Sequence, residues 1–237
     1  MSRQETRSEI PVGDIPVDDL RRSAIALRPI GTPLPLGFVG LAISAAVLSC
    51  LQLGWIPLTE QHQASLALIA FACPLEAVAM VLLFLARDAP TGAGMGVLSF
   101  SWVTLGLLLL TSRPGSTSAA VAVFLFAAGA AMLPAVISAS ISKLVPALIL
   151  LMAAAKFVLT GVYEYTAWVS WERVAGWEGI VLGAVAIYGA LAADLEGEMH
   201  RTILPMGRWG LGRRAIREGL AGQAGKLERE PGVRPQA

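Results

Sequence analysis

Apolar residues occupy long uninterrupted stretches of this chain, and polar residues collect between the stretches and at both ends. Each stretch is about 20 residues long, the length at which an α-helix crosses a hydrocarbon core of about 30 Å. The pattern therefore predicts an all-α polytopic membrane protein, a bundle of six transmembrane helices. The expected spans are Pro35–Leu53, Ala64–Ala86, Ala93–Thr111, Ser118–Ser138, Leu144–Tyr163 and Ala175–Ala193.

The composition agrees with lipid as the solvent of this chain. Hydrophobic residues make up 55% of the 237 residues and charged residues only 15%, whereas about a quarter of an ordinary soluble domain is charged. The loops between the predicted spans are short and leave no room for an extramembrane domain. We therefore expect the function to lie inside the bundle.

Charged residues separate the chain into three parts and predict its orientation. Residues 1–30 form an expected flexible arm, residues 31–207 the transmembrane domain, and residues 208–237 a basic tail. Of the Lys and Arg residues outside the spans, 15 fall on the face that carries both ends and 2 on the other face. Because basic residues concentrate on the cytoplasmic side, both termini are expected in the cytoplasm of a multi-pass plasma (inner) membrane protein.

Few residues are suited to catalysis or to metal binding. Cys50 and Cys73 both lie inside apolar spans, His62 lies in a loop and His200 in the tail, so no metal cluster or acid–base pair is expected within the membrane. Usable nucleotide-binding and nucleophile motifs are absent. We expect a protein that is not an enzyme, with no cofactor, no metal and no nucleic-acid partner, in contact with membrane lipid.

Three ionisable residues inside or at the ends of the apolar spans are candidates for function. A charge at mid-depth in a bilayer costs about 2.5–3.5 kcal/mol, so such a group seldom faces lipid. Glu76 and Lys156 have similar predicted depth and opposite charge. We expect them to meet, either as an ion pair or sharing a proton, and both a transport role and a purely structural role remain open. Glu164, at an outer end, is expected to be a solvated carboxylate.

Two further patterns concern local structure. Pro33 and Pro35 remove two backbone donors, which predicts a non-helical start before the first span. Gly179 and Gly183 have the spacing of a small-residue face, which predicts close packing of the sixth helix on a neighbour, with a pathway lining as the alternative.

Three stretches together resemble one family, the acetate uptake transporters, also described as acetate and succinate permeases of the SatP or YaaH type. The opening stretch 32–37, Thr-Pro-Leu-Pro-Leu-Gly, is similar to the family signature Asn-Pro-Ala-Pro-Leu-Gly. Residues 175–180, Ala-Gly-Trp-Glu-Gly-Ile, resemble its sixth-helix motif, and residues 201–207, Arg-Thr-Ile-Leu-Pro-Met-Gly, its closing motif.

The resemblance implies a function and a set of site residues. It implies a homohexameric ring in which each subunit conducts acetate or a related small monocarboxylate, as a channel or as a proton-coupled transporter. A membrane sensor or assembly protein that does not transport is the alternative. The implied pathway comprises the opening residues Thr32, Pro33, Pro35, Leu36 and Gly37, an apolar constriction of Leu41, Leu98 and Ala153, and Trp102, with Glu76 and Lys156 added as buried charges.

The chain departs from the family pattern at several of these positions. Thr32 stands where the family has Asn, and the constriction residues are smaller than usual, which predicts a wider path. Glu76 falls near a position that generally holds Gln, and Lys156 has no family counterpart. These departures leave the identity of the transported solute open.

Overall fold

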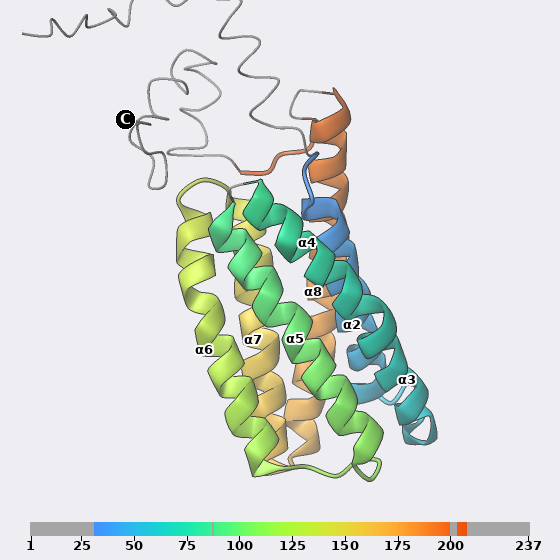
Figure 1. Cartoon of the computed structure of the whole chain (residues 1–237). Coiled ribbons are helices and arrows are strands. Elements are labelled where there is room, and N and C mark those ends of the chain that lie inside the picture. Colours follow the sequence, from blue (N-terminus) through green and yellow to red (C-terminus); the bar gives the residue numbers. More distant parts are fainter. Residues whose placement is uncertain (1–30, 87, 200–202, 208–237) are drawn as a thin grey trace, which may run out of the picture. The chain divides into compact units, whose positions relative to one another are not determined.

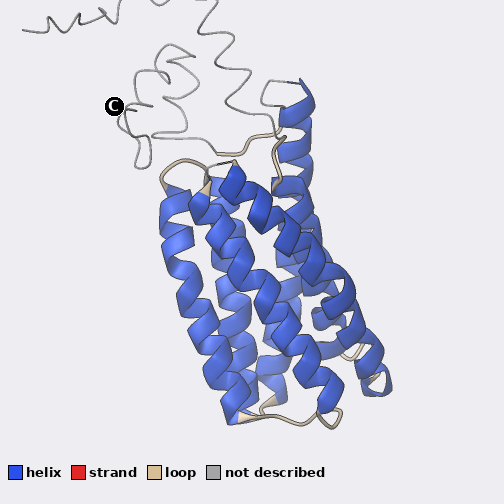
Figure 2. Ribbon diagram, in the orientation of Figure 1, coloured by secondary structure: helices blue, strands red, loops and turns tan. Residues whose placement is uncertain are grey.

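The computed structural model of the chain describes residues 31–86, 88–199 and 203–207. The predicted arm at 1–30 and the predicted tail at 208–237 lie outside the described residues. Within the described part, helices account for the structure and no strand occurs (Figures 1 and 2). The main helices are α2 (Leu34–Gln52), α3 (Gln61–Ala67), α4 (Cys73–Leu85), α5 (Ala89–Thr111), α6 (Ala119–Ser140), α7 (Leu144–Thr166) and α8 (Val169–Met199).

Six helical spans of the described residues are long and apolar enough to cross a membrane. A 3-10 turn η1 (Leu58–Glu60), α3, a π-helical segment η2 (Leu68–Ala72) and α4 together form the second span, and each other span is one helix. The predicted all-α, six-helix polytopic membrane fold is confirmed. Because the number of spans is even, Gly31 and Gly207 lie at the same end of the bundle, hereafter the tail end; the other is the loop end.

The second and sixth spans extend furthest past their predicted ends. The sixth span runs over Val169–Met199 rather than Ala175–Ala193, and the second begins at Leu58 rather than Ala64. The added turns of α8 carry exposed acidic residues such as Asp194 and Glu198. Hydropathy marks only the apolar part of a helix, whereas backbone hydrogen bonding continues through polar turns.

The contact between α2 and α8 is one of the most extensive between two helices of the bundle. The small residues of α8 permit this approach. A Cβ at Gly176 would lie 2.7 Å from Leu53 Cγ, and one at Gly183 would lie 3.4 Å from Ala42 O. The predicted packing role of the small-residue face is confirmed: a side chain at Gly176 would clash with Leu53, and Gly183 lies in van der Waals contact with the backbone of α2.

The first span begins without helical structure, as the two prolines predict. Gly31 to Pro33 are non-helical, Pro33 caps α2, and Pro35 occupies its first turn. Proline is tolerated in the first turn because the backbone N–H groups there have no partner within the helix.

The second span contains a local widening of the helix before Pro74. The π-helical segment Leu68–Ala72 ends where α4 begins at Cys73. Ser99 Oγ of α5 donates a hydrogen bond of 3.0 Å to Cys73 O. A proline cannot complete the α-helical ladder, and a π-bulge absorbs the mismatch. Glu76 lies in the first turn of α4, immediately after this widening.

The last described residues, Ile203 to Gly207, form hydrogen bonds with the start of α7. Leu144 N donates to Gly207 O at 3.1 Å, and Val145 N donates to Met206 O at 3.2 Å. Met206 is buried, and Tyr188 Oη of α8 donates to Pro205 O at 3.0 Å. This closing segment therefore satisfies N–H groups at the beginning of α7 that have no partner within the helix.

Candidate functional site

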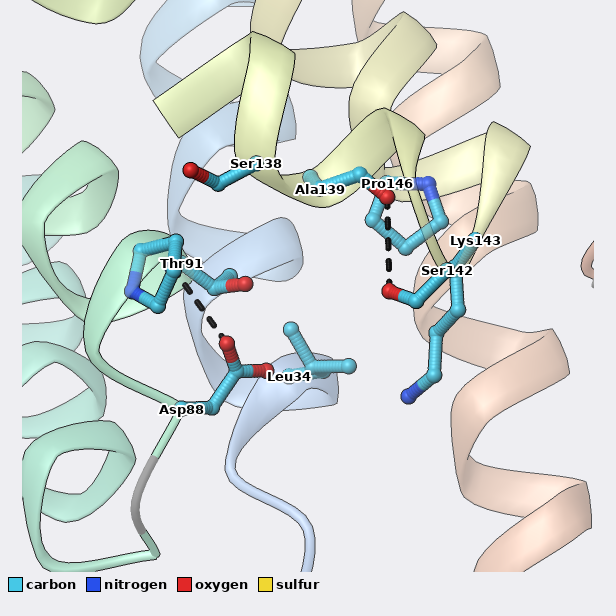
Figure 3. Close-up of a pocket in the computed structure, with 9 residues that line it drawn as sticks. Leu34, Asp88, Thr91, Ser138, Ala139, Ser142, Lys143 and Pro146 are labelled. Atoms are coloured by element: carbon cyan, nitrogen blue, oxygen red, sulfur yellow. Dashed lines mark hydrogen bonds between the residues drawn. The ribbon is translucent and has the colours of Figure 1, made fainter. Parts of the chain in front are cut away.

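A polar cavity of about 100 Å³ opens at the tail end of the bundle (Figure 3). It lies between the starts of α2 and α5 and the turn from α6 to α7. Its volume exceeds the roughly 10–15 Å³ that one water requires. The residues that line it are Leu34, Asp88, Pro90, Thr91, Ser138, Ala139, Ser142, Lys143 and Pro146.

The tail-end cavity carries groups of both charges. Asp88 caps α5 by accepting a hydrogen bond of 3.4 Å from Thr91 N, and Ser142 Oγ donates to Ala139 O at 3.4 Å. Lys143 precedes α7 and extends toward the same space (Figure 3). The lining of the cavity thus combines hydroxyl groups with one acidic and one basic side chain.

Two neighbouring cavities of about 50 and 240 Å³ lie at the loop end. Both are lined by Leu105, Leu109, Ser116 and Glu164. The smaller cavity reaches deeper between α2, α5 and α7. Its polar lining consists of Gln52, Gln61, Ser116, Thr160, Tyr163, Glu164 and Glu172.

Residues at the loop end also position the cavity wall. Gln61 Nε2 donates to Leu109 O at 2.7 Å, and its Oε1 accepts a bond of 3.3 Å from Gly115 N. Glu164 accepts a bond of 2.9 Å from Ser118 N and is half-buried. Glu164 was expected to be a solvated carboxylate. In the structure it is only partly exposed, and its hydrogen bond to Ser118 N stabilises the loop before α6.

The same faces of three helices line the cavities at both ends. The residues concerned recur every seven positions: Leu34, Leu41 and Leu48 on α2, Thr91, Leu98 and Leu105 on α5, and Pro146, Ala153 and Thr160 on α7. Seven residues return to nearly the same face of a helix and advance it by about 10 Å. The three residues predicted to form a constriction therefore lie midway between the two cavities.

The middle level is closed by apolar side chains. Leu41 and Leu98 are 0% exposed and Ala153 is 1% exposed, and all three belong to one buried hydrophobic cluster. Trp102, also fully buried, lies one turn from Leu98, and its ring packs on Phe157 with the ring centroids 5.6 Å apart. The structure thus brings these predicted residues together in the core.

The residues of the opening stretch, 32–37, differ in how far they are exposed. Thr32 is exposed and Leu36 is 36% exposed, while Pro33 is buried and Pro35 partly buried. Gly37 packs on α5, where a Cβ would lie 2.9 Å from Met95 Sδ. The residue of this stretch that lines the tail-end cavity is Leu34, which sequence reasoning did not select although it stands inside the motif.

Lys156 is fully buried and its ammonium group is fully hydrogen-bonded. Nζ donates to Ser49 Oγ at 2.9 Å, to Gln52 Oε1 at 2.7 Å and to Ala175 O at 2.6 Å. These acceptors belong to α2 and α8, so Lys156 of α7 connects three helices. A Cβ at Gly179 would collide with both Ser49 Oγ and Lys156 Nζ, so the glycine makes space for the cation.

The expected meeting of Glu76 and Lys156 is wrong. Glu76 is also fully buried, but its carboxyl group faces Ser44 of α2 and Trp102 of α5. The carboxyl oxygens and Trp102 Nε1 face each other outside hydrogen-bond geometry, and Ser44 Oγ donates to Gly40 O and Leu41 O. The two groups lie at different levels of α2: Glu76 lies beside Gly40 and Ser44, whereas Lys156 bonds to Ser49 and Gln52, about two helical turns further along.

The carboxylate that interacts electrostatically with Lys156 is Glu178 of α8. Both of its oxygens are buried and without a hydrogen-bond partner. Sequence reasoning missed Glu178 as a buried charge, although it lies inside the predicted span Ala175–Ala193. The signal was its position next to Gly179, at the face predicted to pack against another helix.

Among the described residues, no group of three or more His, Cys, Asp or Glu side chains is placed to hold a metal ion. The polar groups that line the cavities are amides, hydroxyls and single charges, which suit recognition of a small polar solute by hydrogen bonds.

Comparison with solved structures identifies a similar fold. The structure of the bacterial acetate channel SatP matches with a TM-score of 0.66, covering 75% of this chain and 99% of that chain. The sequences are 23% identical, so the likeness shows the fold. Searches of family models and of curated protein sequences found no match. The resemblance expected from the three sequence stretches is confirmed at the level of the fold.

Proposed function

We propose that this protein conducts acetate or a related small monocarboxylate across the plasma membrane, along a path within each chain. The fold supports the proposal, because a solved acetate channel has the same arrangement of helices over nearly its whole length. Under this proposal the protein is a transporter or channel rather than an enzyme.

The observation that carries the proposal is the alignment of the cavities with the predicted constriction. Cavities with mixed polar and apolar linings at the two ends and the apolar level of Leu41, Leu98 and Ala153 follow one another on the same faces of α2, α5 and α7. Such an arrangement defines a line through the bundle with polar groups at both mouths and a short apolar barrier between them.

The chemistry of the line fits a small carboxylate with an apolar methyl group. Hydroxyls and Lys143 at the tail end, and amide and hydroxyl groups at the loop end, can donate hydrogen bonds to a carboxylate. The apolar middle suits the methyl group and opposes passage of the charge. Glu164 and Glu172 give the loop end an acidic mouth, which favours entry of the neutral acid or of the anion together with a proton.

Orientation and assembly complete the proposal. Both termini are assigned to the cytoplasm by the distribution of Lys and Arg, so the tail-end cavity opens inward and the loop-end cavity outward. A homohexamer is proposed from the family resemblance. The six pathway residues Thr32, Pro33, Pro35, Leu36, Gly37 and Trp102 act in this proposal by shaping the opening and the core rather than by binding charge.

A second candidate is a sensor or assembly protein that shares the scaffold without conducting a solute. The complete burial of Leu41 and Leu98 favours it, because a permanently closed middle level would block passage. In the transport proposal, the same residues move apart during conduction.

Uptake into proteoliposomes tests the proposal. Purified protein is reconstituted, and entry of labelled acetate, propionate and succinate is measured with and without an inward proton gradient. Saturable acetate entry above empty vesicles is expected. Accumulation above the acetate gradient when protons flow inward would identify a coupled carrier, and simple equilibration a channel. Absence of flux from verified, oriented protein would contradict the transport proposal and favour the sensor.

A further inference from the structure

The smaller of the two cavities at the loop end, hereafter the loop-end cavity, is joined by hydrogen bonds to the buried ammonium group of Lys156. Gln52 lines the cavity together with Thr160. Its Nε2 donates to Thr160 Oγ1 at 3.2 Å, and its Oε1 accepts from Lys156 Nζ at 2.7 Å. The side chain of Gln52 therefore stands between the cavity and the cation and contacts both.

We propose that Lys156 is an anion-binding site at the inner end of the loop-end cavity, where the carboxylate of a small monocarboxylate displaces the amide oxygen of Gln52. This inference rests on the proposed function and deepens it, because it names the group that recognises the charge of the solute.

The set of acceptors around Lys156 explains why an anion fits there. All three hydrogen bonds of Nζ go to neutral oxygens: a hydroxyl, an amide and a backbone carbonyl. Glu178 balances the charge through space, and its oxygens form no hydrogen bond. A carboxylate in direct contact would form a charge-assisted hydrogen bond, about twice as strong as one to a neutral acceptor.

Gln52 is the acceptor that can yield its place. Ala175 O belongs to the backbone of α8, and Ser49 has a short side chain held in the interface of α2 with α8. Gln52 has a longer side chain with more rotatable bonds, and it lines the cavity wall. When it swings toward the cavity, its amide group remains available to the second oxygen of the bound carboxylate.

The position of the site suits binding of a solute that has entered from the loop end and has not yet passed the apolar barrier. Lys156 lies on α7 one turn from Ala153 and one turn from Thr160, between the constriction and the cavity. A solute held there has left the acidic mouth and has its carboxylate at the cation. Because Glu178 already compensates the charge of Lys156, binding is expected to be weak enough for release.

The substitution Gln52→Glu distinguishes a binding site from a structural crosslink. The new carboxylate has the shape of the glutamine side chain and strengthens the contact with Lys156, so a crosslink would keep or improve stability and leave binding unchanged. A binding site would instead be filled by the protein's own carboxylate. Gln63→Glu is the matched control, because it makes the same chemical change at an exposed position of α3.

Binding is measured on purified protein in detergent by saturation-transfer NMR with acetate and with acetamide, its neutral analogue. The wild type and Gln63→Glu are expected to bind acetate at least tenfold more tightly than acetamide. Gln52→Glu is expected to lose at least tenfold in acetate affinity while unfolding at the same or a higher temperature. Equal acetate affinity in Gln52→Glu and in the wild type would overturn the proposal.

Flux measured on the same variants separates this inference from the proposed function. Transport in the wild type that Gln52→Glu preserves would overturn the Lys156 site and leave the transport proposal standing. Specific acetate binding that Gln52→Glu abolishes, in a protein without flux, would support the site and contradict transport. Lys156→Met provides a second variant: if folded, it is expected to lose the preference for acetate over acetamide, and an unchanged preference would overturn the site.

Discussion

Lys156 and Glu76 are both completely buried charged residues in the same bundle, yet their surroundings are opposite. Lys156 donates three hydrogen bonds to groups on two neighbouring helices. Glu76 has no hydrogen-bond partner for either oxygen. Hydrogen bonds therefore tie Lys156 to its neighbours, whereas Glu76 is buried without such bonds. Burial alone therefore does not reveal whether a membrane charge stabilises the fold.

The difference arises from the interfaces that the two residues face. The interface of α2 with α8 supplies Ser49, Gln52 and the space left by Gly179. Near Glu76, the neighbouring groups are Gly40, the hydroxyl of Ser44, which bonds to the backbone of α2, and the indole of Trp102 on α5. Removing the two charges should therefore have very different consequences.

The largest effect is expected for Lys156→Met. Loss of the cation leaves its three acceptors without their donor and leaves Glu178 uncompensated, so the free energy of unfolding should fall by about 3–5 kcal/mol. Denaturation of the purified protein in detergent, followed by circular dichroism, measures the loss.

A double substitution sharpens this first prediction. Because Glu178 is the charge left behind, Lys156→Met combined with Glu178→Gln should be more stable than Lys156→Met alone. If the two single effects simply add, Glu178 and Lys156 are not coupled and the contrast between the two buried regions is weaker than described.

An intermediate effect is expected for Gly179→Ala. The added Cβ collides with Ser49 Oγ and Lys156 Nζ, and overpacking of this kind costs about 1–3 kcal/mol. Gly183→Ala is the control on the same helix, because its Cβ would meet Ala42 O at an ordinary 3.4 Å. Its stability should be unchanged or higher by up to about 1 kcal/mol, the gain in helix propensity. Equal losses in the two variants would show that the space at Gly179 is not specific to Lys156.

The smallest effect is expected for Glu76→Gln. The side-chain shape is kept, no ion pair is removed, and a buried carboxyl group that faces Trp102 and Ser44 outside hydrogen-bond geometry becomes a neutral amide. The free energy of unfolding should therefore change by less than about 1 kcal/mol in either direction. A loss as large as that of Lys156→Met, measured in the same denaturation series, would mean that Glu76 has a stabilising partner and would remove the contrast.

The sequence was sufficient to predict the fold because hydropathy directly encodes the requirement for lipid burial. All six spans were placed correctly, and the non-helical start before α2 followed from Pro33 and Pro35. The exact ends of α8 and of the second span could not be predicted, since a helix continues into polar turns that hydropathy does not mark.

The site was predictable only in part. The resemblance assigned Leu41, Leu98 and Ala153 to an apolar constriction, and the structure shows that all three are buried in the hydrophobic core. The partners of Glu76 and Lys156 could not be read from hydropathy, because the similar depth that the span positions suggested is absent: the two groups contact α2 about two turns apart. The cavity residues Gln52 and Thr160 carry no motif and become visible only when α2 and α7 are packed together.

The closing segment has a consequence for how the protein is made. The N–H groups of Leu144 and Val145 at the beginning of α7 find their acceptors in Gly207 and Met206, which the ribosome adds only after the whole of α8. During synthesis the start of α7 must therefore remain hydrated or bound to another partner, even when the helix is already inserted. The hydrogen bonds from Met206 and Gly207 to the start of α7 therefore form last. If the chain leaves the insertion machinery before they form, the first N–H groups of α7 remain without these acceptors.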